Sequence, residues 1–397
     1  MLANIRYRGI VSFFSSFLLC YALAALYLRS KCYRDPSSIF FRPKSARILT
    51  YSSFRKAQAQ KYSNLAALHA TPKWTNSTDT ELCVGVASVS RHGFSYLKET
   101  LGSILEGLDD LERRNIYLVV FLAHTNQSEH EDFRQPWLVN MADSLPTYPN
   151  GSNTISLVRQ LEIEGNYEAH ARKQKIDYSV LLNECAKVNP KYTMTLEDDV
   201  IALDGWYHRA LSALEIASRK TRELGRDSFL YLRIFYDGRL LGWNSEEWPL
   251  YVKWSVAVVI IEVSILLALR RHIVASRRAL TAPVIFLVCG GLVFPQRQVL
   301  DHLLPLYRDT QDNHAAVDTF LEDWANNNDG LRWAVTPVLI QHVGGKSSHG
   351  AGDQEAGSLT DDMPFDYSFE TNDPIKLAKE HRARIVKIRE QATTIAR

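Results

Sequence analysis

Three consecutive acids, Glu197, Asp198 and Asp199, are the residues whose types and spacing most directly suggest chemistry. They follow the half-apolar run KYTMTL (191–196), whose pattern predicts a strand. Side chains alternate along extended backbone, so Glu197 and Asp199 would project to one side and Asp198 to the other. Carboxylate oxygens so placed suit a hard divalent cation, Mg²⁺ or Mn²⁺; the alternative is a solvated acidic turn.

The position of the acids along the chain bears on this choice. In open α/β sheets, ligands bind beyond the carboxyl ends of the strands, which is where these acids are predicted to lie. A cation is most useful there when the substrate carries phosphates, because it bridges phosphate oxygens and neutralises a leaving group. The surrounding elements must therefore form such a sheet.

Strand and helix patterns alternate around the acids. ELCVGVASVSR (81–91) and NIYLVVFLAH (115–124) are predicted as buried strands, with a helix over 94–114 between them. Strand, helix and strand of these lengths indicate a βαβ unit and a parallel sheet. Further strands are predicted at 153–161, at 333–344, where the strand runs into a loop, and at 365–370. Further helices are predicted at 172–188, 204–224 and 316–328, with Asp204 as the N-cap of its helix.

Three apolar runs, 9–28, 251–269 and 279–294, predict membrane spans. No small-residue cleavage site follows the first run, so we expect an uncleaved anchor. The other two runs form a hairpin whose loop, 270–278, carries four arginines and is assigned to the cytosol by the positive-inside rule. Both flanks of the hairpin, with Asp198 and His342, are then lumenal, which N-x-S/T acceptors at Asn76, Asn126 and Asn150 also fit.

These runs define the expected organisation of the chain. It comprises a cytosolic tail (1–8), an anchor (9–28), a polar stem (29–80), and one α/β domain in two parts, 81–250 and 301–397 with its C-terminal tail, interrupted by the membrane hairpin 251–300. The 46 basic residues nearly balance the 44 acidic ones, which disfavours a nucleic-acid binder. Two of the residues Cys32, Cys83 and Cys185 could form a disulfide, but the sequence does not show which two. No Cys/His spacing indicates structural zinc.

Three segments carry a resemblance to a known family: VASVSRHGFSYLKETLGSIL, KIDYSVLLNECAKVNPKYTMTLEDDV and PVLIQHVGGKSS. They resemble the GT-A glycosyltransferases that include N-acetylglucosaminyltransferase IV. The resemblance is closer still to the Golgi transferases that add N-acetylgalactosamine to the GPI core after protein attachment. It covers most of residues 81–372 and implies a GT-A (Rossmann-like) domain interrupted by a transmembrane hairpin.

The resemblance implies a set of metal and nucleotide ligands. Asp199 would be the direct metal ligand, while Glu197 and Asp198 would contact the metal, its waters or the ribose of a UDP-sugar. His342 would bring an imidazole to the metal or diphosphate, the alternative being a core histidine. Further nucleotide contacts, each also compatible with an ordinary surface position, are expected at Ser90, Arg91, His92, Lys175, Asp177, Lys346 and Ser347.

Inverting sugar transfer needs a base that deprotonates the acceptor hydroxyl. Asp318 stands where related transferases carry their base, at the start of a short helix. Its alternative role is that of an N-cap, in which case Glu322 or Asp323 would replace it as the base.

The resulting hypothesis is a metal-dependent (Mn²⁺ or Mg²⁺) inverting glycosyltransferase that uses a UDP-sugar. Its location would be the Golgi membrane or the ER, multi-pass, with the catalytic domain in the lumen. It would transfer N-acetylgalactosamine or a related hexose to the glycan of a GPI-anchored protein or GPI lipid. The alternatives are an N-glycan-branching N-acetylglucosaminyltransferase, which would not need the hairpin, and a catalytically inactive membrane scaffold or receptor.

Overall fold

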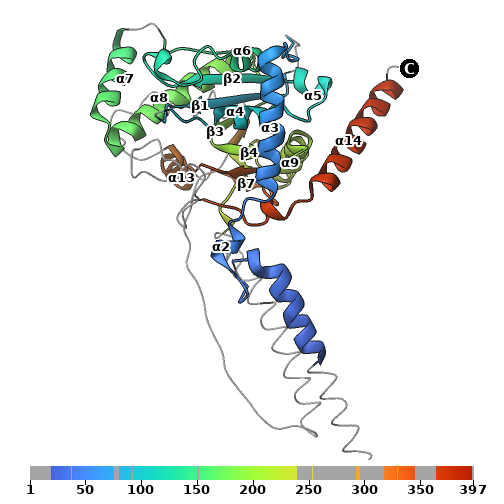
Figure 1. Ribbon diagram of the computed structural model, residues 1–397. Helices are drawn as coiled ribbons and strands as arrows, with labels where there is room; N and C mark the ends of the chain where they lie inside the picture. The colour runs from blue at the N-terminus through green and yellow to red at the C-terminus, as the bar shows by residue number, and fades with distance from the viewer. Residues whose placement is uncertain are drawn as a thin grey trace, which may run out of the picture.

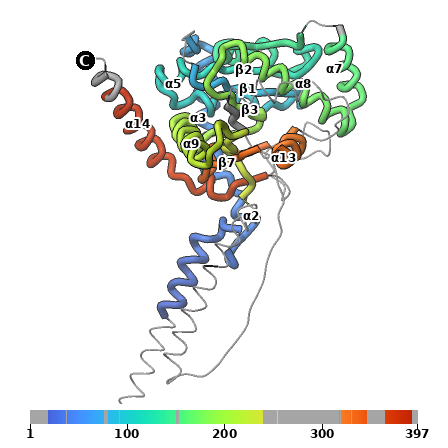
Figure 2. Tube along the Cα trace, turned by 180° about the vertical axis from the view of Figure 1, so that it is seen from behind, coloured from blue at the N-terminus to red at the C-terminus, as the bar shows by residue number. Residues whose placement is uncertain are grey.

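The structure is a computed structural model that describes residues 19–36, 38–75, 80–91, 93–149, 152–238, 253, 292–295, 317–328, 330–344 and 364–395. A mixed α/β body has a sheet at its centre with helices on both faces, and a helical segment near the N-terminus extends away from it (Figure 1). The view from behind shows the same arrangement, with α7 and α14 at opposite ends of the body (Figure 2).

The central sheet has the order β2-β1-β3-β6-β5-β7. Its strands are β1 (Leu82–Ser88), β2 (Ile116–Leu122), β3 (Tyr192–Glu197), β5 (Tyr231–Arg233), β6 (Leu292–Pro295) and β7 (Arg332–Ala334). The strands β2, β1 and β3 run parallel, whereas β6 is antiparallel to both β3 and β5. The parallel pairs put the carboxyl ends of β1 and β3 at the same edge of the sheet, where the acidic run begins.

Side-chain alternation in β1 explains why helices cover both faces. Leu82, Val84 and Val86 enter one apolar cluster with residues of α4 (Leu97–Leu105), while Cys83 enters another with residues of α8 (Tyr167–Ala186). A strand buried on both faces in this way is typical of a parallel sheet. The other helices are α2 (Pro43–Ala46), α3 (Tyr51–Leu68), α5 (Asp110–Arg114), α6 (Pro136–Met141), α7 (Ser152–Glu164), α9 (Trp206–Glu223), α13 (Val317–Asn327) and α14 (Pro374–Ile395), with 3₁₀ turns at Cys32–Arg34, Gln127–Glu129 and Phe369–Thr371.

A second, two-stranded sheet joins β4 (Val200–Ala202) to β8 (Ile340–His342). The strands are antiparallel, and Val200 is paired with His342. This register brings the histidine beside the acids, although more than 140 residues separate them along the chain.

Part of the segment predicted to be a stem packs into the domain. Helix α3 lies against α4 and α6. Its Arg55 is fully buried, donates to the carbonyl oxygens of Ala202 and Ser103 at 3.1 and 2.9 Å, and is paired with Glu106. Buried charged groups need such partners, so α3 belongs to the fold that supports β4.

Three local predictions were wrong. Residues 153–161, predicted as a strand, lie in helix α7, where Ile155, Val158 and Leu161 face the core at helical spacing. The predicted strand at 365–370 is a turn followed by a 3₁₀ turn. Asp204 does not cap α9, because Gly205 occupies the N-cap position with a φ of 72°.

The multi-pass membrane arrangement is also contradicted. Within the described ranges, no helix combines the length and apolarity needed to cross a bilayer, which overturns the expected multi-pass location in the Golgi membrane. The third apolar run was assigned to a membrane span through residue 294, but Leu292–Pro295 form β6 in the central sheet. A short apolar run does not by itself distinguish a buried strand from a helix. The tail 1–8, residues 9–18 of the anchor, and residues 251–252, 254–291 and 296–300 of the hairpin lie outside the described residues.

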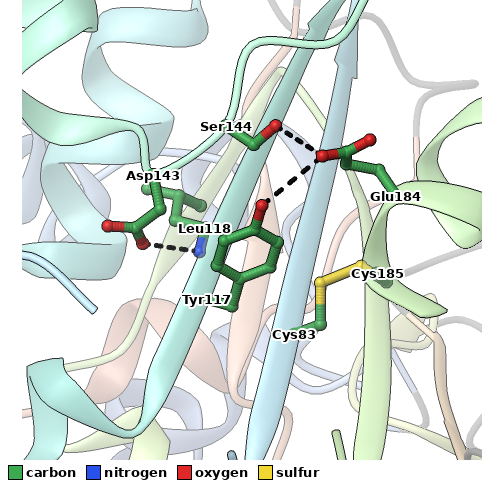
Figure 3. Close-up of a disulfide and its surroundings, with 7 residues drawn as sticks. All are labelled: Cys83, Tyr117, Leu118, Asp143, Ser144, Glu184 and Cys185. Carbon is green, nitrogen blue, oxygen red and sulfur yellow. Dashed lines mark hydrogen bonds between the residues drawn. A yellow bond between two sulfur atoms is a disulfide. The ribbon is translucent and has the colours of Figure 1, made fainter. Parts of the chain in front are cut away.

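One disulfide connects the sheet to the helix that covers it. Cys83 of β1 is bonded to Cys185 of α8, with their Cα atoms 5.7 Å apart (Figure 3). Beside it, Glu184 accepts hydrogen bonds from Ser144 at 2.8 Å and from the hydroxyl of Tyr117 at 3.4 Å. The bond spans 102 positions along the chain and fixes α8 to β1.

Replacing both Cys83 and Cys185 with alanine is expected to lower the free energy of unfolding by about 2–5 kcal/mol, because a long loop in the unfolded chain is no longer closed. Urea denaturation followed by tryptophan fluorescence measures the change. Cys32→Ala is the control, since Cys32 is a free cysteine and its loss should leave the midpoint unchanged. Equal midpoints for the double variant and the control would contradict the assigned role.

Candidate active site at the end of β3

Three potential ligands converge at the edge of the sheet. Glu197 ends β3, Asp199 lies in the turn before β4, and His342 ends β8. Each offers one ligand atom within 4.8 Å of those of the others. The Nε2 atom of His342 is 3.2 Å from Oδ2 of Asp199 and 4.0 Å from Oε2 of Glu197. The strand pairings thus build a carboxylate–carboxylate–imidazole set.

The charges of neighbouring residues determine the pKa values of Asp199 and His342. Burial alone would raise the pKa of Asp199, but His342 and Arg91 hold it at about 2. Burial would lower the pKa of His342, but the charge of Asp199 raises it to about 9. In the absence of a cation, the two residues therefore form an ion pair.

A divalent cation fits these residues. Oδ1 of Asp199 and Nδ1 of His342 are buried and make no hydrogen bond. An unsatisfied buried carboxylate oxygen is costly and needs an explanation. Two carboxylates and an imidazole are ligands that Mn²⁺ and related divalent ions accept. Glu197 is the exposed member of the set, and 45% of its side-chain surface is accessible to solvent.

Asp198 points away from this set and has different partners. Its two oxygens accept hydrogen bonds from the two terminal nitrogens of Arg91, each at 2.7 Å, and it also accepts from Ser88. The hydroxyl of Thr100 donates to the carbonyl oxygens of Asp198 and Val200 at 2.6 and 2.9 Å. Burial raises the pKa of Asp198, and the bonds from Arg91 oppose that rise. Asp198 and Arg91 therefore fix the turn that presents Asp199.

Gly344 is a site residue that the sequence analysis missed. A Cβ atom at this position would lie 2.1 Å from Oδ2 and 2.8 Å from Cγ of Asp199. Beside Gly344, the backbone amide of Val343 donates a hydrogen bond to the carbonyl oxygen of Asp199 at 2.9 Å. Only glycine leaves room for the carboxylate here. The available signal was the Gly344-Gly345 pair directly after QHV.

Gly344→Ala is expected to displace the carboxylate of Asp199 and to weaken Mn²⁺ binding by about tenfold or more, since misplacing positioned groups by about 1 Å can cost 100-fold. Calorimetric titration with Mn²⁺ measures the effect. Gly85→Ala is the matched control, because a Cβ there meets only Leu181, at an ordinary 3.4 Å. Equal Mn²⁺ affinity in both variants would contradict the expectation.

The structure places two of the other predicted nucleotide contacts, Arg91 and Ser90, in different surroundings. Arg91 is 3.6 Å from Asp199 through Nη2 and lies over the ring of Tyr96. Ser90 is turned toward Glu131, to which its hydroxyl donates at 2.6 Å. His92, Lys346 and Ser347 lie outside the described residues.

The helix α8 holds its predicted residues in buried positions. Asp177 accepts hydrogen bonds from Lys173 at 2.9 Å and from Tyr148 at 2.5 Å, and burial raises its pKa. Lys175 is buried with its ammonium 4.7 Å from the ring centre of Phe320, and burial lowers its pKa. Asp177 is thus engaged within the fold, whereas Lys175 contacts α13.

The helix α13 begins near α8 and carries the expected base. The amide of Val317 donates to Gln174 of α8 at 3.4 Å, and Asp318 follows in the first turn. Glu322 is paired with Arg332 at 2.5 Å and with Arg233, and it accepts from Tyr231. Asp323 is exposed. The ion pairs of Glu322 make it a poor alternative base.

The model of the family described as "GPI-N-acetylgalactosamine transferase PGAP4" matches residues 82–294, which run from the first residue of β1 into β6. The matched range therefore contains Glu197 and Asp199 and ends before His342.

Curated relatives are transferases that act on glycoproteins. Alpha-1,3-mannosyl-glycoprotein 4-beta-N-acetylglucosaminyltransferase B of Danio rerio is 28% identical over 33% of this chain and 25% of its own. Alpha-1,3-mannosyl-glycoprotein 4-beta-N-acetylglucosaminyltransferase C of Macaca fascicularis is 25% identical over an alignment that covers 49% of this chain and 44% of that enzyme. The chain thus spans less than half the length of these relatives. A solved structure, the mannosyltransferase Ktr4p from S. cerevisiae, aligns with 53% of this chain and 54% of its own at 10% identity and a TM-score of 0.21, too low to support an argument.

Proposed function

Because the chain belongs to the glycosyltransferase family of the GPI-N-acetylgalactosamine transferase PGAP4, we propose that it transfers N-acetylgalactosamine from a UDP-sugar to the glycan of a GPI anchor. The proposal includes a GT-A arrangement of the α/β domain. It also includes a dependence on a divalent cation, Mn²⁺ or Mg²⁺.

The observation that carries the proposal is the ligand set of Glu197, Asp199 and His342 beyond the carboxyl end of β3. When bound there, a divalent cation would neutralise the diphosphate that leaves with the nucleotide. Asp199 and His342 would hold it through a carboxylate oxygen and a ring nitrogen, and Glu197 would complete the set from the solvent side. Arg91 and Asp198 would keep the turn rigid, so that binding costs little rearrangement.

The acceptor side of the reaction requires a base, and Asp318 is our candidate. It lies in the first turn of α13, next to Val317, which contacts α8, and the ion pairs of Glu322 disfavour that residue as the base. Asp318→Asn should lower kcat with little change in the KM for the UDP-sugar. A changed KM with an unchanged kcat would assign Asp318 to donor binding instead.

The curated relatives favour a second acceptor. They are named as N-acetylglucosaminyltransferases that act on alpha-1,3-mannosyl-glycoproteins, so an N-glycan acceptor and a UDP-N-acetylglucosamine donor form the alternative. Both functions would use the same cation site, and they differ in the sugars that are recognised.

A single assay compares the two functions. The purified full chain is incubated with UDP-N-acetylgalactosamine or UDP-N-acetylglucosamine, and with either released GPI glycans or biantennary N-glycans, and products are identified by mass spectrometry. We expect product only from UDP-N-acetylgalactosamine and the GPI glycan, and loss of product with EDTA. Product on the N-glycan alone would establish the alternative, and turnover indifferent to EDTA would exclude the cation role.

A further inference from the structure

A second cluster of potential ligands lies where α5, α9 and α14 meet. Glu112 of α5, His208 of α9 and His381 of α14 each offer a ligand atom within 4.8 Å of the others. The three helices are on the same side of the body in both views (Figures 1 and 2). None of these residues belongs to the set at the end of β3, and the proposed transfer reaction does not use them.

His381 is held in one orientation by two acids. Its Nδ1 atom is 2.9 Å from Oδ1 of Asp204, and its Nε2 atom is 3.1 Å from Oε2 of Glu112. The rings of His381 and His208 are 5.3 Å apart. A metal-binding histidine commonly donates the proton of one ring nitrogen to a carboxylate, while its other nitrogen faces the ion.

His208 supplies an independent observation. Its Nδ1 atom is buried and makes no hydrogen bond. A buried nitrogen without a hydrogen-bond partner needs an explanation, and a cation bound beside His381 and Glu112 would supply the missing partner.

Gly205 makes the close approach of the two rings possible. It has a φ of 72°, and a Cβ atom there would lie 2.5 Å from Cε1 of His208 and 3.3 Å from Cγ of His381. The left-handed turn before α9 therefore opens the space in which the imidazoles lie.

We propose that Glu112, His208 and His381 bind a zinc ion, with Asp204 as the residue that orients His381. Two imidazoles and one carboxylate are a common zinc ligand set, with a fourth position left for water. Mn²⁺ and Mg²⁺ favour sites richer in oxygen, such as the one at the end of β3.

The position of this site indicates what the ion would do. Among residues 374–390 of α14, only Leu377 and His381 are buried, one helical turn apart. Exposed ion pairs, such as Arg389–Asp109 at 3.3 Å, add little stability. The ion would thus attach α14 to α5 and α9, which are distant from it in sequence.

The test uses the full chain without a histidine tag, carrying Asp199→Ala so that the first site cannot bind metal tightly. After equilibration with zinc and desalting, zinc per chain is measured by mass spectrometry. We expect one equivalent that is lost with His208→Ala and reduced with Asp204→Asn. His69→Ala, which changes an exposed histidine, should retain it.

Trypsin digestion provides a second readout in case a variant folds poorly. Zinc should slow cleavage within α14, which carries Lys376, Lys379, Arg382 and Arg384, and should have no such effect in the His208→Ala variant. Circular dichroism checks that this variant is folded. Equal zinc content in the His208→Ala and His69→Ala proteins, or no zinc in either, would overturn the proposal and leave His381 as an ion-paired histidine only.

Discussion

Replacing Asp199 with asparagine is expected to lower the rate of sugar transfer by about two to three orders of magnitude. The change keeps the size of the side chain but removes the negative charge that faces His342 at 3.2 Å. A bound cation contributes several kcal/mol of charge stabilisation to the transition state, and each ~1.4 kcal/mol corresponds to a tenfold rate. The rate is measured with saturating UDP-N-acetylgalactosamine over a range of Mn²⁺ concentrations.

Part of the lost activity should return at high Mn²⁺, because the variant binds the ion more weakly rather than lacking the site. Asp227→Asn, in the exposed loop after α9, is the matched control and should behave as the unmodified protein. Thermal unfolding of both proteins shows whether the fold is retained. A folded Asp199→Asn protein with an unchanged rate would exclude Asp199 as a ligand.

The largest loss of stability is expected from Arg91→Met. Arg91 and Asp198 are both buried and are joined by two hydrogen bonds of 2.7 Å. Removing one partner of a buried ion pair leaves an uncompensated charge and typically costs 3–5 kcal/mol. Urea denaturation gives the free energy of unfolding, and we expect a decrease of about this size.

Two further variants test whether charge pairing between Arg91 and Asp198 accounts for this loss. Arg219→Met removes a charge from an exposed pair with Glu223, whose N–O distance is 3.9 Å, and should cost no more than about 1 kcal/mol. Arg91→Met combined with Asp198→Leu removes both charges and should recover much of the loss. If the double variant is as unstable as Arg91→Met alone, packing rather than charge pairing accounts for the effect.

Much of the fold could be predicted because several elements have strong local signals. The predicted strands at 81–91 and 115–124 are confirmed as β1 and β2, the helix at 172–188 overlaps α8, and the helix at 316–328 is α13. The helix expected over 94–114 is divided into α4 and α5, and Gly107 lies between them with a φ of 90°. The identity of β6 could not be predicted, since four apolar residues become a strand only through partners distant in sequence.

The candidate site was predictable to a similar extent. Strand alternation alone places Glu197 and Asp199 on one side and Asp198 on the other. The partners of Asp198 were not accessible to this argument, because Arg91, Ser88 and Thr100 reach it through tertiary packing. The cluster of Glu112, His208 and His381 has no sequence spacing that would reveal it, since each ligand comes from a different helix.

The place of β6 between β3 and β5 has a consequence for the order in which this protein matures during synthesis. The ribosome completes β2, β1 and β3 first, but β5 pairs only with β6 and β7 among the described strands. Until residue 295 has emerged, β3 presents an unpaired edge, and such edges invite association with other chains. His342 follows still later, so the cation ligands come together only when most of the chain has been translated. A nascent chain arrested before β6 should therefore depend on chaperones and should lack transferase activity.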